Sequence, residues 1–185
     1  MMSAVGVISC AHGAWIESSI TMGRALAAAI GGGAESRVHT PVDAAGLAAC
    51  LGEAAYVILH THGSPEGIYD QRADGRSTTV ATLADIGRLP PLPHLHLVIA
   101  TACQAAGGDP GQNLAAALSR KIAPEGLVIA NRHVVFGADY DFGEREGRRG
   151  WVAYRAGRCV LTEQDLPARL TMADAYGIYL ENRLK

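Results

Sequence analysis

Short apolar runs alternate with helical segments over the first 131 residues, and this alternation limits the fold more than any other feature. Each run is rich in Val, Ile and Leu and is bounded by Gly, Pro or polar residues, which is typical of a buried strand. Strands that alternate with helices favour one mostly parallel sheet with helices on both faces, an α/β fold. The pattern predicts strands over residues 4–9, 37–40, 55–61, 95–103 and 127–131, and helices over residues 15–30, 41–51, 82–89 and 113–122.

The remaining segments carry weaker patterns. Residues 64–77 are polar and contain Gly67 and Gly75, which indicates an excursion built as a small hairpin. Residues 132–150 show the least pattern, and we expect a long functional loop without regular structure there. Residues 151–162 predict a hairpin near one edge of the sheet, and the tail from Asp165 predicts a closing amphipathic helix.

Length and composition favour one globular domain that spans residues 1–185. The apolar share of 49% is high enough to build a core, and the net charge of −2 offers no strong field for nucleic acid or an anionic membrane. No apolar run approaches the roughly 20 residues of a membrane-spanning helix, and the N-terminus lacks the features of a signal peptide. We therefore expect a cytoplasmic protein with neither nucleic acid nor a membrane as its partner.

The four cysteines are spaced too widely for a CxxC motif, which argues against a zinc site or a thioredoxin-type redox pair. Without a secretory signal they are expected to be reduced thiols. Cys50 lies on an apolar helix face and Cys159 in the hairpin, so we expect both to be shielded, whereas Cys10 and Cys103 end predicted strands. No metal and no organic cofactor is predicted.

Two of the predicted strands end in residues that carry chemistry. Residues 56–59 run into His60, Thr61, His62 and Gly63, and residues 97–100 run into Thr101, Ala102 and Cys103. Open α/β sheets bind their ligands at the carboxyl ends of the strands, so a thiol and an imidazole are expected side by side. These are the nucleophile and the proton donor needed for acyl transfer, and backbone amides at a glycine turn supply an oxyanion hole. His60 shares a strand face with His62.

Residues 62–69 (HGSPEGIY) and residues 97–108 (LVIATACQAAGG), together with the helix, strand and loop up to residue 137, carry a resemblance to a known family. They resemble the caspase-like (clan CD) cysteine peptidases, with CHAT domains as the nearest type. The resemblance implies a three-layer caspase-like sandwich and a cysteine endopeptidase that hydrolyses a peptide bond through a thioester. It implies His62 as the catalytic histidine, Cys103 as the nucleophile, and the amides of Gly63 and Cys103 as the oxyanion hole. A protein or peptide substrate and a regulatory protein partner follow from the same resemblance.

The sequence departs from caspases at two points. Thr101 stands where caspases have glutamine, and no arginine pair is found for an acidic substrate side chain, which argues against cleavage after aspartate. In this clan the loop after the fifth strand builds the pocket for the residue that precedes the cut. Here it carries Asp139, Asp141 and Glu144, whose carboxylates would favour arginine or lysine through charge-assisted hydrogen bonds. The alternative is a solvated acidic loop.

Two other classes of function stay open. A catalytically inactive CHAT-like interaction module would keep the same residues without using them. Residues 5–26 (VGVISCAHGAWIESSITMGRAL) also resemble the start of mannose-type phosphotransferase IIA domains, in which a histidine after the first strand carries phosphate. In this chain that residue would be His12, and the match is confined to this one short segment.

Overall fold

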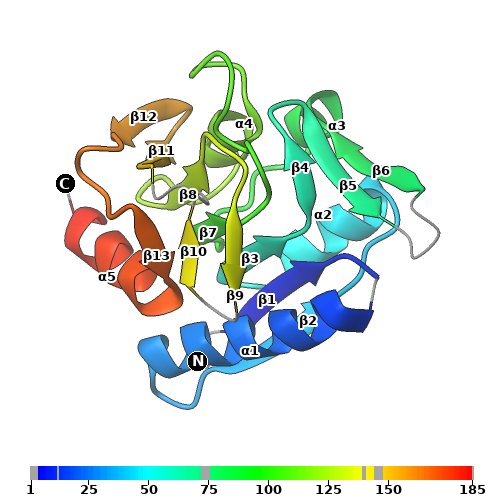
Figure 1. Ribbon diagram of the computed structural model, residues 1–185, viewed down its shortest axis with the longest axis horizontal. Coiled ribbons are helices and arrows are strands. Elements are labelled where there is room, and N and C mark those ends of the chain that lie inside the picture. Colours follow the sequence, from blue (N-terminus) through cyan, green and yellow to red (C-terminus); the bar gives the residue numbers. More distant parts are fainter. Residues whose placement is uncertain (1–3, 12, 72–75, 139–140, 144–147, 185) are drawn as a thin grey trace.

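A seven-stranded, mostly parallel sheet lies at the centre of the computed structural model (Figure 1). The structure describes residues 4–11, 13–71, 76–138, 141–143 and 148–184. The strand order is β12-β11-β8-β7-β3-β1-β2, and β11 runs antiparallel to both of its neighbours. The strands are β1 (Ala4–Ser9), β2 (Glu35–His39), β3 (Tyr56–His60), β7 (Leu97–Ala100), β8 (Leu127–Asn131), β11 (Trp151–Arg155) and β12 (Arg158–Leu161).

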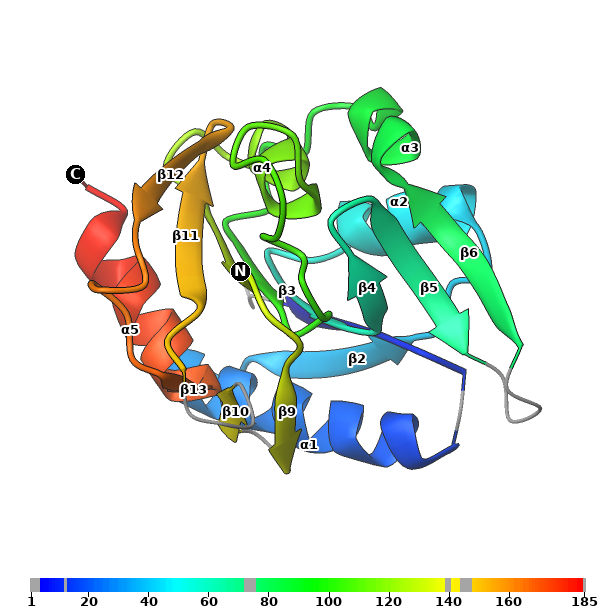
Figure 2. The same cartoon turned by 45° about the horizontal axis from the view of Figure 1, so that its top comes forward.

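Helices cover both faces of this sheet, as the alternating pattern predicts (Figure 2). Side chains of each strand alternate between two cores. In β3, for example, Ile58 joins the core beneath α1 (Gly13–Ile30) and α5 (Met172–Asn182), which we call the α1 face. Val57 and Leu59 join the core on the opposite face, beneath α2 (Ala44–Gly52), α3 (Leu83–Arg88) and α4 (Leu114–Ser119). The prediction of an α/β fold with a mostly parallel sheet and helices on both faces is confirmed.

Side-chain caps set where several helices begin. Thr82 accepts from the amide of Asp85 while the Asp85 carboxylate accepts from the amide of Thr82, which closes a capping box at the start of α3. Asn113 caps α4 by accepting from the amide of Ala116. The first residues of the two predicted helices, Thr82 and Asn113, are thus the N-caps, and the helices themselves begin at Leu83 and Leu114. No helix in the described residues is long and apolar enough to cross a bilayer.

Two small antiparallel sheets flank the central one. The first, in the order β4-β5-β6, continues directly from β3 and leads into α3, where the sequence predicts a small hairpin. The second has the order β13-β10-β9 and joins segments distant in sequence. Their strands are β4 (His62–Ser64), β5 (Gly67–Gln71), β6 (Ser77–Thr82), β9 (Phe136–Ala138), β10 (Asp141–Gly143) and β13 (Arg169–Thr171).

The second small sheet differs from the sequence prediction. The segment expected to be an unstructured loop contains β9 and β10, and the tail expected to be helical from Asp165 first forms β13. Each of these strands has three residues, too few to show a period of two, and they are held together because β10 pairs with both β9 and β13. The helix begins only at Met172 because Thr171 and Asp174 form a second capping box.

Candidate active site

The strands that end in histidine and cysteine are neighbours, as predicted. β3 and β7 pair in parallel with Leu59 opposite Ala100, and the amide of Thr101 donates to the carbonyl of Leu59 at 3.0 Å. Thr101 also donates through its hydroxyl to the same carbonyl at 3.1 Å. The pairing therefore continues one residue beyond β7 and brings the turn that contains Cys103 to the end of β3.

Gly63 is the point at which the two strand ends touch. A Cβ atom placed on Gly63 would lie 2.7 Å from Ala102 Cβ, closer than real Cβ atoms approach their neighbours, and at a tight 3.1 Å from the Cys103 carbonyl oxygen. Only glycine fits against the cysteine turn without a shift of the backbone. The contact extends along the chain, since the carbonyl of Pro65 accepts from the amide of Leu114 at 3.0 Å.

Cys103 is half-buried on a turn that is tied to the next strand as well. Its Sγ lies 3.8 Å from the carbonyl oxygen of Val135, a residue packed on the α1 face. The following amide, that of Gln104, donates to the carbonyl of His133 at 3.0 Å, and Gln104 has a left-handed φ of 55°. Among the described residues the amide of Cys103 itself has no hydrogen-bond partner. This amide is therefore available to an incoming oxyanion.

His62 is the first residue of β4, where it pairs with Tyr69 of β5. Its half-buried ring lies against Trp15 in the first turn of α1, with ring centroids 4.6 Å apart. Burial lowers the pKa of His62 below its ordinary value, and the nearby Asp70 carboxylate opposes this by raising it. Within the described part of the chain neither ring nitrogen of His62 makes a hydrogen bond. A neutral imidazole with free nitrogens on the α1 face is suited to proton transfer.

A buried hydrogen-bonded chain lies directly below this site. His60 Nδ1 is 2.9 Å from Ser19 Oγ, Ser19 Oγ donates to Ser9 Oγ at 2.8 Å, and Ser9 Oγ donates to the carbonyl of Cys10 at 3.1 Å. The carbonyl can only accept, so each hydroxyl donates towards it and His60 Nδ1 must carry the proton. Burial, followed by the charge of His62, lowers the pKa of His60 to about 4, so the ring is neutral at pH 7.

The sequence analysis did not single out Trp15, Ser19 or Ser9. Trp15 and Ser19 are four residues apart on α1, and a spacing of four places two side chains on one helix face. That face meets the end of β3, because Trp15 also stacks on His60 with ring centroids 4.5 Å apart. The sequence shows that Trp15 and Ser19 share a helix face. It does not show that this face packs on the end of β3.

The other predicted site residues either lie in β10 or fall outside the described residues. Asp141 begins β10, where its backbone pairs with Ala138 and Thr171. Asp139, Glu144 and His12 fall outside the described residues. A specificity role for the acidic loop therefore stays a prediction.

The remaining cysteines differ from Cys103 in their surroundings. Cys10 was expected to be the main competitor for reagents, but it is only 1% exposed and its Sγ lies 3.6 Å from the Tyr69 carbonyl. Cys50 and Cys159 are half-buried, so the expectation that they are shielded holds only in part. Burial raises the pKa of both thiols, which lowers their thiolate fraction at neutral pH.

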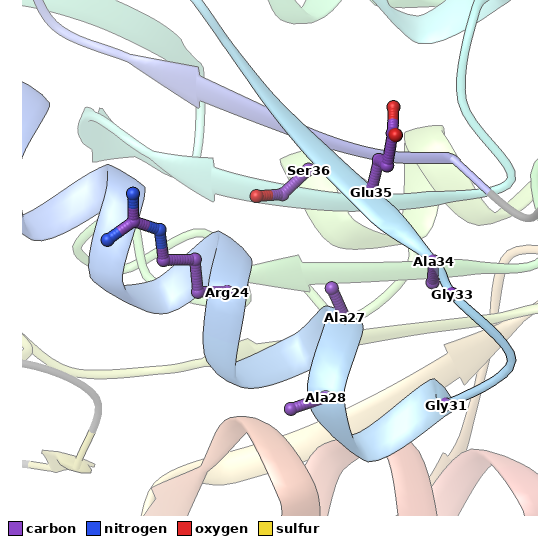
Figure 3. Close-up of a pocket in the computed structure, with 8 residues that line it drawn as sticks. All are labelled: Arg24, Ala27, Ala28, Gly31, Gly33, Ala34, Glu35 and Ser36. Carbon is purple, nitrogen blue, oxygen red and sulfur yellow. The ribbon is translucent and has the colours of Figure 1, made fainter.

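A cavity of about 550 Å³ lies elsewhere, between the C-terminal half of α1 and the start of β2 (Figure 3). Arg24 and Ala28 reach it from α1, while Ser36 lines it from β2. It is at the amino end of β2, whereas His62 and Cys103 follow the carboxyl ends of β3 and β7. The cavity is thus distinct from the candidate active site at the strand ends.

No protein-family model matches the chain, and a comparison with curated proteins also finds no match. Among the described residues no group of three or more His, Cys, Asp or Glu side chains is arranged to hold a metal ion. The site contains the half-buried thiol of Cys103 and the imidazole of His62, whose ring nitrogens have no hydrogen-bond partner among the described residues.

Proposed function

We propose that the protein is a cysteine endopeptidase of the caspase-like type, with Cys103 as nucleophile and His62 as proton donor. The observation that carries the proposal is the contact of Gly63 with Ala102 and the Cys103 carbonyl, which joins the histidine strand to the cysteine turn. The mostly parallel sheet with helices on both faces supports the caspase-like fold. The Cys103 thiol lies beside the Val135 carbonyl, and the His62 ring lies against Trp15 of α1.

The proposed reaction begins when the Cys103 thiol loses its proton to water and the thiolate attacks the carbonyl carbon of the scissile bond. The new C–S bond leaves a negative oxygen, which accepts hydrogen bonds from the amides of Cys103 and Gly63. The C–N bond then breaks while His62, which has taken up a proton from water, gives that proton to the leaving amine. Water attacks the thioester, His62 takes a proton from that water, and the thiolate leaves the carbonyl carbon and is reprotonated.

An extended peptide is the substrate that best fits the surroundings of Cys103. Val135, whose carbonyl lies 3.8 Å from Cys103 Sγ, leads directly into β9. β9 is the edge strand of the β13-β10-β9 sheet, so a peptide that adds to this edge would pass the thiol. This arrangement supports a protein or peptide substrate. A regulatory protein partner is a further part of the proposal, carried by the family resemblance.

Covalent labelling of the folded protein tests the proposal. A mixture of peptidyl acyloxymethyl ketones with varied side chains should label Cys103 first, since burial raises the pKa of the Cys50 and Cys159 thiols and Cys10 is buried. Mass spectrometry of the tryptic peptides identifies the labelled thiol. Cys103→Ala should abolish labelling and peptide hydrolysis, and His62→Ala should leave slow alkylation but remove hydrolysis.

Cys159→Ala is the matched control, because Cys159 is half-buried like Cys103 but lies in β12. It should leave labelling and hydrolysis unchanged. Equal labelling of all four thiols in the folded wild type would contradict an activated Cys103. A folded protein that neither reacts with the ketones nor cleaves any peptide in a mixed library would favour the inactive interaction module instead.

A further inference from the structure

The start of α1 lies against the candidate catalytic histidine. Trp15 is in the first turn of this helix, and its ring stacks on His62 and on His60, with ring centroids 4.6 Å and 4.5 Å apart. The indole plane is tilted by 53° from the His62 ring and by 36° from the His60 ring, so it is parallel to neither imidazole. One tryptophan therefore contacts both histidines at the end of β3.

Hydrogen bonds of neighbouring residues fix the position of Trp15. Ser19, one turn along α1, is fully buried and joins His60 to Ser9 through the hydrogen-bonded chain. A shift of the helix start would break this chain and leave buried polar groups without partners, which is costly. A second tie holds the turn before the helix, where the amide of Ala11 donates to Asp70 at 3.1 Å. These hydrogen bonds hold the start of α1, and with it Trp15, in place.

Within the described residues the imidazole of His62, in contrast, has no hydrogen-bonded tie of its own. The titratable groups near it include Asp70, His60, its backbone partner Tyr69 and, across the contact at Gly63, Cys103. A histidine in a catalytic pair needs a fixed orientation, because a misplacement of about 1 Å can cost roughly 100-fold in rate. The ring contact with Trp15 is the contact in the described structure that can supply that orientation.

We propose that Trp15 is a positioning residue for His62, holding the imidazole in the orientation from which it protonates the leaving group. This inference rests on the proposed peptidase function. Trp15 takes no part in the chemistry itself and acts through the histidine. Its removal should therefore slow only those reactions that depend on His62, and leave binding of the substrate largely unchanged.

Two substrates with the same peptidyl group separate this role from a general loss of structure. In a peptidyl anilide the amine needs a proton to leave, whereas in a peptidyl nitrophenyl ester the phenolate leaves without one. Values of kcat/KM report on the first half-reaction for both substrates, so later hydrolysis of the thioester does not enter. Trp15→Ala should reduce kcat/KM for the anilide about 10- to 100-fold and for the ester less than about 3-fold.

A double-mutant cycle and two further variants sharpen the test. His62→Ala should show the same selective loss, and adding Trp15→Ala to it should cause little further loss, because the two residues act as one unit. Trp15→Phe keeps an aromatic ring beside His62 and should restore most of the anilide activity. Tyr176→Ala is the matched control: it removes an aromatic contact of α5, the edge-on pair with Tyr56, and should leave the anilide-to-ester ratio unchanged.

The possible failures are distinguishable. Wild-type protein that hydrolyses neither substrate would overturn the peptidase function and this inference with it. Active wild-type protein with an unchanged anilide-to-ester ratio in folded Trp15→Ala would overturn the positioning role alone. Equal loss on both substrates, or independent losses in the double-mutant cycle, would have the same meaning. Circular dichroism and thermal unfolding establish that each variant is folded.

Discussion

The buried imidazole of His60 makes the stability of the protein depend on pH. In the folded state burial and the charge of His62 lower the pKa of His60 to about 4, whereas the unfolded chain has the ordinary value of 6.5. Above pH 6.5 the ring is neutral in both states and its full contribution to stability is present. As the pH falls from 6.5 to 4 the unfolded state takes up a proton that the folded state refuses, so stability is lost across this window.

The size of the effect follows from the two pKa values. Each pH unit between them corresponds to about 1.4 kcal/mol, so the complete loss is roughly 3 kcal/mol. A loss of this size is a large part of the total stability of an ordinary domain, which is about 5–15 kcal/mol. Below pH 4 both states are protonated and no further loss comes from this residue.

Urea unfolding followed by circular dichroism at pH 7 and pH 4 measures this loss. Carboxylates titrate in the same window, so the informative quantity is the difference between the wild type and His60→Gln, which keeps an N–H donor for Ser19 but does not titrate. The variant should lose roughly 3 kcal/mol less than the wild type between the two pH values. His94→Gln, at an exposed histidine, is the control and should behave like the wild type. A wild-type and His60→Gln difference below about 1 kcal/mol would refute the reasoning.

Two substitutions near the site should lower the stability of the protein, and one of them should also reduce labelling. Gly63→Ala places a Cβ 2.7 Å from Ala102 Cβ and should cost about 1–3 kcal/mol in urea unfolding and reduce ketone labelling, while Gly87→Ala, where a Cβ meets nothing within 4 Å, should do neither. A stable, fully labelled Gly63→Ala would count against the close contact. Ser19→Ala should cost about 1–3 kcal/mol because it leaves the His60 N–H without its acceptor, and an unchanged melting temperature would show that the buried chain does not stabilise the fold.

Local sequence patterns predict much of the architecture. Runs such as residues 97–100 and 127–131 consist of apolar side chains flanked by turn residues, and they form strands wherever they are buried. Thr82 and Asn113 are residue types that favour the N-cap position, and each of them caps a helix in the structure. The alternation of these elements favours a parallel sheet. In such a sheet the residues that follow neighbouring strands, here His62 and Cys103, are expected at the same end of the sheet. Each of these features depends on a few neighbouring residues, so it can be predicted without knowledge of the tertiary structure.

Other features depended on the tertiary structure. β9, β10 and β13 are three residues each and become strands only by pairing with one another, so no local pattern marks them. The chain from His60 through Ser19 to Ser9 joins β3, α1 and β1, and each of its members is an ordinary buried polar residue when considered alone. Trp15 is an aromatic residue on a helix until its face is seen against His62. These contacts join residues far apart in sequence, and only the packing of α1 on the sheet decides which of them meet.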